Sequence, residues 1–291
     1  MPESQLDIWS QWLLKGRFGG DPVRMKKMLD WLYPVRDKVL SHINLEDEKT
    51  LLDVGCGDGL IAFGALAKFE KSQAIFSDIS DDLLNHVQRL AKEMNVHNRC
   101  QFVHASADDL SMLNNESVDA VTTRSVLIYV SDKQQAFNEF HRVLKPGGQL
   151  SIFEAINRFA FPEPPDRFEG YDITPVMEIT QKLKDVYERI QPSGIDPMGD
   201  FDERDLIAHA EKAGFKEIHL ELQIEIKPSE DADWSELMNT AFNPKIPTLA
   251  EAMQQALTSD EADAFINHLR PLVESKQGIQ RSSIAYLWAI K

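Results

Sequence analysis

The sequence predicts an α/β protein built on a doubly wound, mostly parallel sheet of seven strands, with N-terminal helices and an inserted helical cap. Two patterns predict this fold. Short apolar stretches alternate with helical periodicity from residue 50 to residue 155, and a glycine-rich turn follows the first stretch. Alternation of strand and helix indicates a parallel sheet with helices on both faces. The composition agrees, since 43% hydrophobic and 27% charged residues are typical of a packed globular protein.

Seven segments have the length and apolar character of strands. They are Thr50–Val54, Gln73–Asp78, Cys100–His104, Val118–Thr123, Gln149–Ala155, Lys216–Ile226 and Ser282–Ile290. The first five alternate with helices in the way that a doubly wound sheet requires.

The helices between these segments carry their own start and stop signals. Ser80 can cap the helix after the second strand. Ser131 and Gln134 form a capping-box pattern for a later helix. We expect that helix to end at Lys145-Pro146-Gly147-Gly148, which we interpret as a turn. Residues 202–213 form a further helix of the core.

Four parts of the chain are distinguished by these patterns. Residues 1–45 read as an N-terminal helical lid, and residues 46–156 as the α/β core. Residues 157–200 break the alternation and read as a cap insertion over the sheet, while residues 201–291 return to the core with additional helices. The insertion is marked by a cluster of prolines: Pro162, Pro164, Pro165, Pro175, Pro192 and Pro197.

Composition excludes several classes of partner. The formal net charge of −16 repels phosphate backbones, so nucleic acid is not expected as a substrate. No apolar run reaches the roughly 18 residues of a membrane span. The first residues lack the basic start and apolar stretch of a secretory signal. With only Cys56 and Cys100 as thiols and no zinc-type spacing, we expect a cytoplasmic protein without a bound metal.

The glycine-rich turn after the first strand is the most informative motif. It reads Asp53-Val-Gly-Cys-Gly-Asp-Gly59, and its glycines let a ligand approach the backbone amides closely. Three interpretations compete: a turn without a ligand, a dinucleotide site and a site for a nucleoside sulfonium. The dinucleotide fingerprint is G-x-G-x-x-G, whereas the spacing here is G-x-G-x-G.

Later motifs decide between these interpretations. Asp78-Ile79-Ser80 ends the second strand, and Ala105 to Leu110, Val118 to Val121 and Arg142 to Gly148 follow in order. With this set the chain resembles the class I S-adenosylmethionine (SAM) dependent methyltransferases over about residues 48 to 225. The resemblance implies a Rossmann-like fold, SAM as cofactor, and direct SN2-type methyl transfer to a small-molecule acceptor.

The resemblance also implies which residues bind the cofactor. They are Asp53, Gly55, Cys56, Gly57, Gly59, Asp78, Ile79, Ser106, Ala107, Asp108, Arg124 and Arg17. Gly55 and Gly57 would pass beneath the methionine part of SAM, with Asp53 near its amino group. Arg17, in a loop of the lid, could pair with the SAM carboxylate, and the backbone of Arg124 could hold the same region.

The resemblance implies that residues after the second and third strands bind the adenosine half of SAM. Asp78 would accept the two ribose hydroxyls, and Ile79 would pack against adenine. Ala107 would present its amide to the adenine edge. The family often has Asp where this chain has Ser106, so Ser106 or Asp108 would meet the adenine amino group.

The acceptor is expected over the carboxyl ends of the fourth and fifth strands, the usual crevice of such sheets. Glu154 and Tyr129 are our candidates for catalytic contacts with the acceptor, and each has ordinary packing as an alternative. Phe168 and Tyr171 from the insertion are expected to close over the site.

Other functions remain as alternatives at this level. A protein acceptor is less favoured, because a cap limits access. Aminopropyl transferases share the nucleotide site, but typically carry acidic residues after the fourth strand, where this chain has Thr122-Thr123-Arg124-Ser125. A non-catalytic SAM-binding or scaffolding protein is the third alternative.

Overall fold

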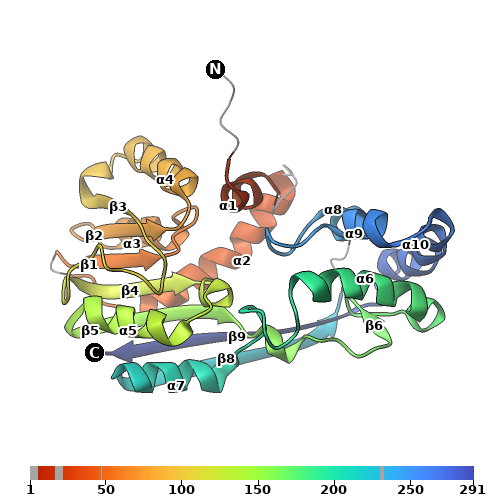
Figure 1. The fold of residues 1–291 in the computed structure, drawn as a ribbon. Coiled ribbons are helices and arrows are strands. Elements are labelled where there is room, and N and C mark those ends of the chain that lie inside the picture. Colours follow the sequence, from red (N-terminus) through yellow and green to blue (C-terminus); the bar gives the residue numbers. More distant parts are fainter. Residues whose placement is uncertain (1–5, 17–21, 47, 230–232) are drawn as a thin grey trace.

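The computed structural model describes residues 6–16, 22–46, 48–229 and 233–291, and its centre is a seven-stranded sheet in the order β3-β2-β1-β4-β5-β9-β8 (Figure 1). The strands are β1 (Thr50–Val54), β2 (Gln73–Asp78), β3 (Cys100–His104), β4 (Val118–Arg124), β5 (Leu144–Ala155), β8 (Lys216–Pro228) and β9 (Ile279–Ile290). Only β9 runs against its neighbours in this sheet. The predicted doubly wound, mostly parallel sheet is therefore confirmed.

Helices cover both faces of the sheet. They are α1 (Ile8–Gln11), α2 (Pro22–Ser41), α3 (Leu60–Lys68), α4 (Asp81–Glu93), α5 (Lys133–Val143), α6 (Met177–Ile190), α7 (Glu203–Ala213), α8 (Trp234–Asn239), α9 (Leu249–Ala256) and α10 (Ser259–Glu274). Helices α2, α3 and α4 pack on one face, and α5 and α7 on the other. No helix among the described residues is long and apolar enough to cross a membrane.

Capping residues explain where several helices begin and end. The Ser80 side chain accepts the amide of Leu83 at 3.0 Å and starts α4, as predicted. The predicted capping box of Ser131 and Gln134 is wrong. Asp132 caps α5 instead, because its carboxylate accepts the amide of Gln135 at 2.9 Å. Asp132, one residue after Ser131, thus supplies the hydrogen-bond acceptor for a free amide in the first turn of α5.

Strand β5 begins earlier than predicted. The expected turn Lys145-Pro146-Gly147-Gly148 lies inside the strand, which starts at Leu144. The amide of Gly147 donates to the carbonyl of Lys291, and the amide of Lys291 to the carbonyl of Gly148, so these residues belong to the ladder. The proline and glycines instead coincide with a register shift against β4.

The cap has an apolar core of its own, drawn from two distant stretches of sequence. Phe168, Tyr171 and Leu183 from the first stretch pack with Phe265 and Leu269 from the second. In Figure 1 the green α6 lies beside the blue α9 and α10. The small hairpin of β6 (Arg167–Phe168) and β7 (Tyr171–Asp172) was not predicted. Phe168 and Tyr171 fill this core, so they do not close over the acceptor as expected.

The N-terminal segment (residues 6–16) packs against the α/β core. Helix α1 continues into one stretch of π-helix, η1 (Trp12–Gly16). Figure 1 shows α1 near α4, over the region where the core strands end, with the chain before α9 on its other side. This position places α1 between the core and the cap.

Candidate active site

The strand order defines where a ligand crevice lies. From β1 the chain first winds outward through β2 and β3, and then crosses back to β4 and β5 on the other side. Ligands bind in such sheets outside the carboxyl ends of the strands at this reversal. The glycine-rich turn follows β1, Asp78 ends β2, and Ser125 follows β4 with a left-handed φ of 55°. All three therefore meet at the same edge.

Three glycines of the turn have left-handed backbone angles, for different reasons. A Cβ on Gly55 would lie 2.4 Å from Val126, and one on Gly59 would lie 2.6 Å from Phe63, so both positions are closed by protein packing. Within the part of the chain that the structure describes, a Cβ on Gly57 would meet only the end of Leu13 in η1, at 3.1 Å. Gly57 therefore faces the space between the turn and the N-terminal segment.

Asp78 connects the end of β2 to the glycine-rich turn. Its carboxylate accepts the amide of Gly57 at 2.9 Å and the amide of Ser80 at 3.0 Å. Burial raises the pKa of Asp78, and these amide hydrogen bonds oppose the rise. Each carboxylate oxygen can still accept a further hydrogen bond. The neighbouring Ile79 is 48% exposed, an apolar surface at the position expected to pack on adenine.

Asp53 and Cys56 are placed differently from the other predicted cofactor residues. The buried carboxylate of Asp53 accepts the hydroxyl of Thr122 at 3.0 Å and the amide of Ala62 at 3.1 Å. Burial raises the pKa of Asp53 to about 7. The Cys56 thiol is buried in the core between α3 and α4, which raises its pKa. Both side chains thus hold the turn from behind. The backbone of Cys56 is also bonded within the protein, because its amide donates to the carbonyl of Ser77 at 2.9 Å and its carbonyl accepts the amide of Gly59 at 2.8 Å.

The segment after β3 borders the same edge. Its start is tied to β2, because the amide of Ala105 donates to the carbonyl of Asp78 at 3.1 Å. The Ser106 hydroxyl donates to the carboxylate of Asp108 at 2.6 Å, while Ala107 is buried. Ser106 and Asp108 are therefore bonded to each other on the segment whose start is tied to Asp78, at the position where the family often has a single Asp.

Glu154 is placed differently from the expected acceptor contact. Its side chain is fully buried, and Oε1 accepts the amides of Val126 and Leu127 at 2.9 and 3.0 Å. The second oxygen, Oε2, is buried and has no hydrogen-bond partner among the described residues. Burial raises the pKa of Glu154 to about 7. The carboxyl group therefore anchors the segment after β4 from below, and it does not face open space.

Tyr129, at the end of the 3-10 turn η3 (Leu127–Tyr129), occupies a more open position. The Trp9 ring packs edge-on against the Tyr129 ring with centroids 4.9 Å apart. On another side the ammonium of Lys245 lies 5.8 Å from the Tyr129 ring centroid. Arg124 ends β4 half-buried, and Arg17 lies outside the described residues. Of the two catalytic candidates, Tyr129 is the one at the meeting point of lid, core and cap.

The contacts that dock α1 on this edge were not predicted from the sequence. The carboxylate of Asp7 caps α1 and accepts the Ser80 hydroxyl at 2.6 Å, while the amide of Asp7 donates to Asp82 at 2.8 Å. The hydroxyl of Ser10 also lies 3.0 Å from that of Ser80. An acidic residue directly before an apolar helix is a capping signal, so the cap was detectable. The bond of Asp7 to Ser80, which lies 73 positions away, was not detectable from the sequence.

The residues at this edge fit SAM. Asp78 supplies a carboxylate acceptor for paired hydroxyls, and Ile79 an exposed apolar surface for a base. A side chain at position 57 would fill the space between the turn and Leu13. The amides at the start of α3 favour a carboxylate nearby. The exposed Ile79, the carboxylate of Asp78 and the amides of α3 thus follow the order of base, ribose and carboxylate in an adenosyl amino acid.

Comparisons with known proteins agree with this assignment. The family model described as a methyltransferase domain matches residues 52–152. A ubiquinone/menaquinone biosynthesis C-methyltransferase of Rickettsia typhi is 32% identical over 178 residues, which cover 58% of this chain and 69% of that protein. A ubiquinone biosynthesis O-methyltransferase of Coxiella burnetii is 32% identical over 144 residues, but the chain spans only 56% of its length.

The fold is also found among solved structures. A structure described as a putative methyltransferase from Bacillus halodurans matches with a TM-score of 0.52 and 19% identity, over 88% of this chain and 98% of that one. The strand order, the glycine-rich turn and the carboxylate ending β2 define the class as a SAM-dependent methyltransferase. The chain belongs to the class I SAM-dependent methyltransferase family, and SAM is its cofactor.

Proposed function

We propose that this protein transfers a methyl group from SAM to an aromatic small molecule whose acceptor atom is a ring carbon or a ring hydroxyl oxygen. The observation that carries the cofactor assignment is the hydrogen bond from the amide of Gly57 to the carboxylate of Asp78, which would join the acceptor of the ribose hydroxyls to the turn beneath the methionine. The aromatic acceptor is suggested by the relatives, whose names describe methylation in quinone biosynthesis.

The protein would contribute alignment and water exclusion to this reaction. SAM, when bound, supplies a methyl group activated by a positively charged sulfur. Asp78 would hold the ribose hydroxyls, and Gly57 would let the methionine part lie close to the backbone. Leu13 and Trp9 of the N-terminal segment would exclude water above the cofactor. In this proposal residues 6–16 act as the lid.

Glu154 would act as a positioning residue. Its carboxyl group holds two consecutive amides of the segment that carries Tyr129. The left-handed Ser125 directly before those amides needs such support, because a non-glycine residue is strained at this backbone angle. Tyr129 is the side chain of that segment which would touch the acceptor.

Calorimetry and a labelled-methyl assay test this proposal. The wild type should bind SAM and transfer a labelled methyl group to at least one phenol, catechol or quinol of a panel. Asp78→Ala should weaken SAM binding by about 1–3 kcal/mol, since a charged hydrogen-bond acceptor is lost. The matched control is Asp109→Ala, because Asp109 is an exposed carboxylate on the neighbouring turn. Equal SAM affinity of the Asp78 variant and the wild type would contradict the ribose role.

A further inference from the structure

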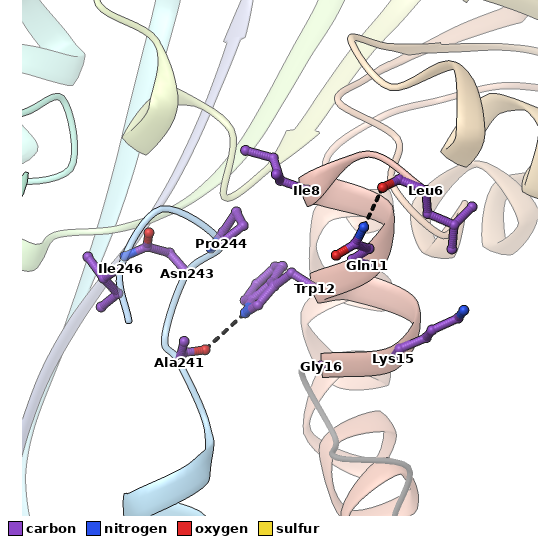
Figure 2. A pocket seen from close by; sticks show the side chains of 10 residues that line it. All are labelled: Leu6, Ile8, Gln11, Trp12, Lys15, Gly16, Ala241, Asn243, Pro244 and Ile246. Atoms are coloured by element: carbon purple, nitrogen blue, oxygen red, sulfur yellow. Dashed lines mark hydrogen bonds between the residues drawn. The ribbon is translucent and has the colours of Figure 1, made fainter. Parts of the chain in front are cut away.

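A cavity of about 920 Å³ lies between the N-terminal segment and the loop of residues 241–246. Its walls are mainly apolar, with Ile8 and Trp12 on one side and Pro244 and Ile246 on the other. Figure 2 shows Ile8, Trp12 and Pro244 around the gap between the helix and the loop. Binding sites for small organic molecules commonly have volumes of roughly 300–1,000 Å³ and apolar walls. The cavity therefore has the size and lining of a ligand site.

The cavity and the cofactor edge lie on different faces of the same short segment. Leu13, Ser10 and Trp9 meet Gly57, Ser80 and Tyr129 of the core. Ile8 and Trp12 face the cavity, and Trp12 Nε1 donates to the carbonyl of Ala241 at 2.9 Å (Figure 2). The segment is thus bound to core and cap at once, and the loop of residues 241–246 supplies the described residues of the opposite cavity wall.

Tyr129 lies next to both elements that form the cavity. Trp9 of the segment and Lys245 of the loop both contact its ring. These two elements are the walls of the cavity, and Tyr129 lies in the segment after β4, where the acceptor is expected. Trp9 directly follows the lining residue Ile8, and Lys245 lies between the lining residues Pro244 and Ile246, so the Tyr129 ring contacts the direct neighbour of a lining residue on each wall.

The charge of the cavity differs from that of the whole protein. The formal net charge is −16, yet the described residues that line the cavity include Lys15 and no carboxylate. The ammonium of Lys245 adds a second positive charge at the Tyr129 end. An anionic group is favoured there over a cationic one, because an unpaired like charge would be destabilising.

We propose that this cavity binds the methyl acceptor, and that the acceptor is an apolar aromatic molecule bearing an anionic oxygen group. Its apolar body packs between Trp12 and Pro244, and its anionic oxygen lies near Lys245 and Tyr129. This inference rests on the proposed function for the identity of the occupant as acceptor, whereas the presence of the binding site itself can be tested without turnover.

Two fluorescent probes that differ by one group test the site. 8-Anilinonaphthalene-1-sulfonate is apolar, aromatic and anionic, and N-phenyl-1-naphthylamine has the same skeleton without the sulfonate. Ile8→Asp places a carboxylate in the cavity and should weaken both probes about tenfold. Lys245→Gln should weaken the sulfonate about fivefold, as for loss of a partly exposed ion pair, and leave the neutral probe unchanged.

Met112→Asp is the matched control. Met112 is also exposed, but it lies on the loop bound by Arg142 at the far end of α5. This variant should bind both probes as the wild type does. The site is overturned if the wild type shows no saturable probe binding, or if Ile8→Asp binds like Met112→Asp. The anionic part is overturned if Lys245→Gln leaves the ratio of the two affinities unchanged.

SAM calorimetry on the same samples separates this inference from the proposed function. Ile8→Asp should keep wild-type SAM affinity, because Ile8 lines the cavity and is not among the side chains that meet Gly57, Ser80 or Tyr129. Lys245→Gln is judged by the two probes alone, since Lys245 contacts the Tyr129 ring. Loss of SAM binding by the wild type would defeat the proposed function. Normal SAM binding and methyl transfer, with cavity variants that act like the control, would defeat only the inference about the cavity.

Discussion

The hydroxyl of Ser80 donates a 2.6 Å hydrogen bond to the carboxylate of Asp7, joining the start of the N-terminal helix to the start of α4. The amide of Ser80 meanwhile donates to Asp78, the predicted ribose acceptor. Burial opposes ionisation of Asp7, but hydrogen bonds from Ser80, Ser10 and Trp9 outweigh it and lower the pKa of Asp7. Ser80 therefore connects α1 to the carboxylate of Asp78.

The contact between Asp7 and Ser80 should contribute to SAM affinity. We expect Asp7→Ala and Ser80→Ala each to weaken SAM binding by about 1–2 kcal/mol. Asp7→Ala removes the cap of α1, Ser80→Ala removes the cap of α4, and each removes the bond between the two helices. The double variant should lose less than the sum, since both single changes remove the same bond. Calorimetry on the four proteins measures this coupling, with Asp30→Ala on the exposed side of α2 as control. Strict additivity would show that the contact does not act as one unit.

Glu154 should make folding stability depend on pH. Burial raises its pKa to about 7, with the charge of Lys133 acting in the opposite direction. The native protein thus binds a proton more tightly than the unfolded chain does. This tighter proton binding by Glu154 stabilises the native protein fully below the pKa of the unfolded chain, near 4.5. The stabilisation is lost as the pH rises through about 7.

Glu154→Gln should flatten this dependence, because an amide resembles the protonated carboxyl group and can still accept the amides of Val126 and Leu127. Urea unfolding between about pH 5 and pH 8 measures the effect, which is on the order of 3 kcal/mol for such a shift. Asp53 has a pKa raised to about 7 by burial as well, so Asp53→Asn should remove a second part of the slope. An unchanged slope in both variants would contradict the burial of these charges.

Alanine substitutions at two glycines of the turn should affect different properties of the protein. Gly59→Ala places a Cβ 2.6 Å from the Phe63 ring at a left-handed backbone angle, so we expect a lower melting temperature. Gly57→Ala meets only the flexible end of Leu13, so strain of about 1–2 kcal/mol is expected from the backbone angle. Its larger effect should be on SAM affinity. Calorimetric melting and SAM titration distinguish the two, and wild-type SAM binding by Gly57→Ala would contradict the placement.

Neither thiol should react in the native protein. Burial raises the pKa of Cys56, and burial raises the pKa of Cys100 to about 11. The reactive thiolate is therefore scarce near neutral pH. A colorimetric thiol reagent should label almost none of either residue under native conditions and both in urea. Rapid native labelling of a Cys100→Ser variant would show that Cys56 is accessible from the crevice.

Local signals predicted the core better than the cap. The bounds of β1, β2 and β3 are as predicted, because their apolar runs end in glycine or polar residues. Asp202 caps α7, and Gly214 ends it with a φ of 98°, so both ends of this helix could be identified locally. The start of β5 could not, because its pairing with Lys291 comes from the other end of the chain.

The candidate site was predictable in its cofactor half and not in its acceptor half. The turn and Asp78 follow directly from motifs that sit at strand ends. Glu154 is also at a strand end, but whether its side chain faces solvent or the amides of Val126 and Leu127 depends on the path of a different segment. The cavity beside Trp12 depends on a loop more than 200 positions away, which no local pattern could associate with it.

The interior position of β9 has a consequence for how the protein forms during synthesis. Strands β1 to β5 can pair in chain order, but β5 then exposes a long edge of unpaired amides and carbonyls until residues 279–290 arrive. The two stretches of the cap are made in the meantime. A nascent chain that stalls before β9 should therefore be a client for chaperones, and shortening β9 should reduce the yield of folded protein more than an equally long deletion in the cap.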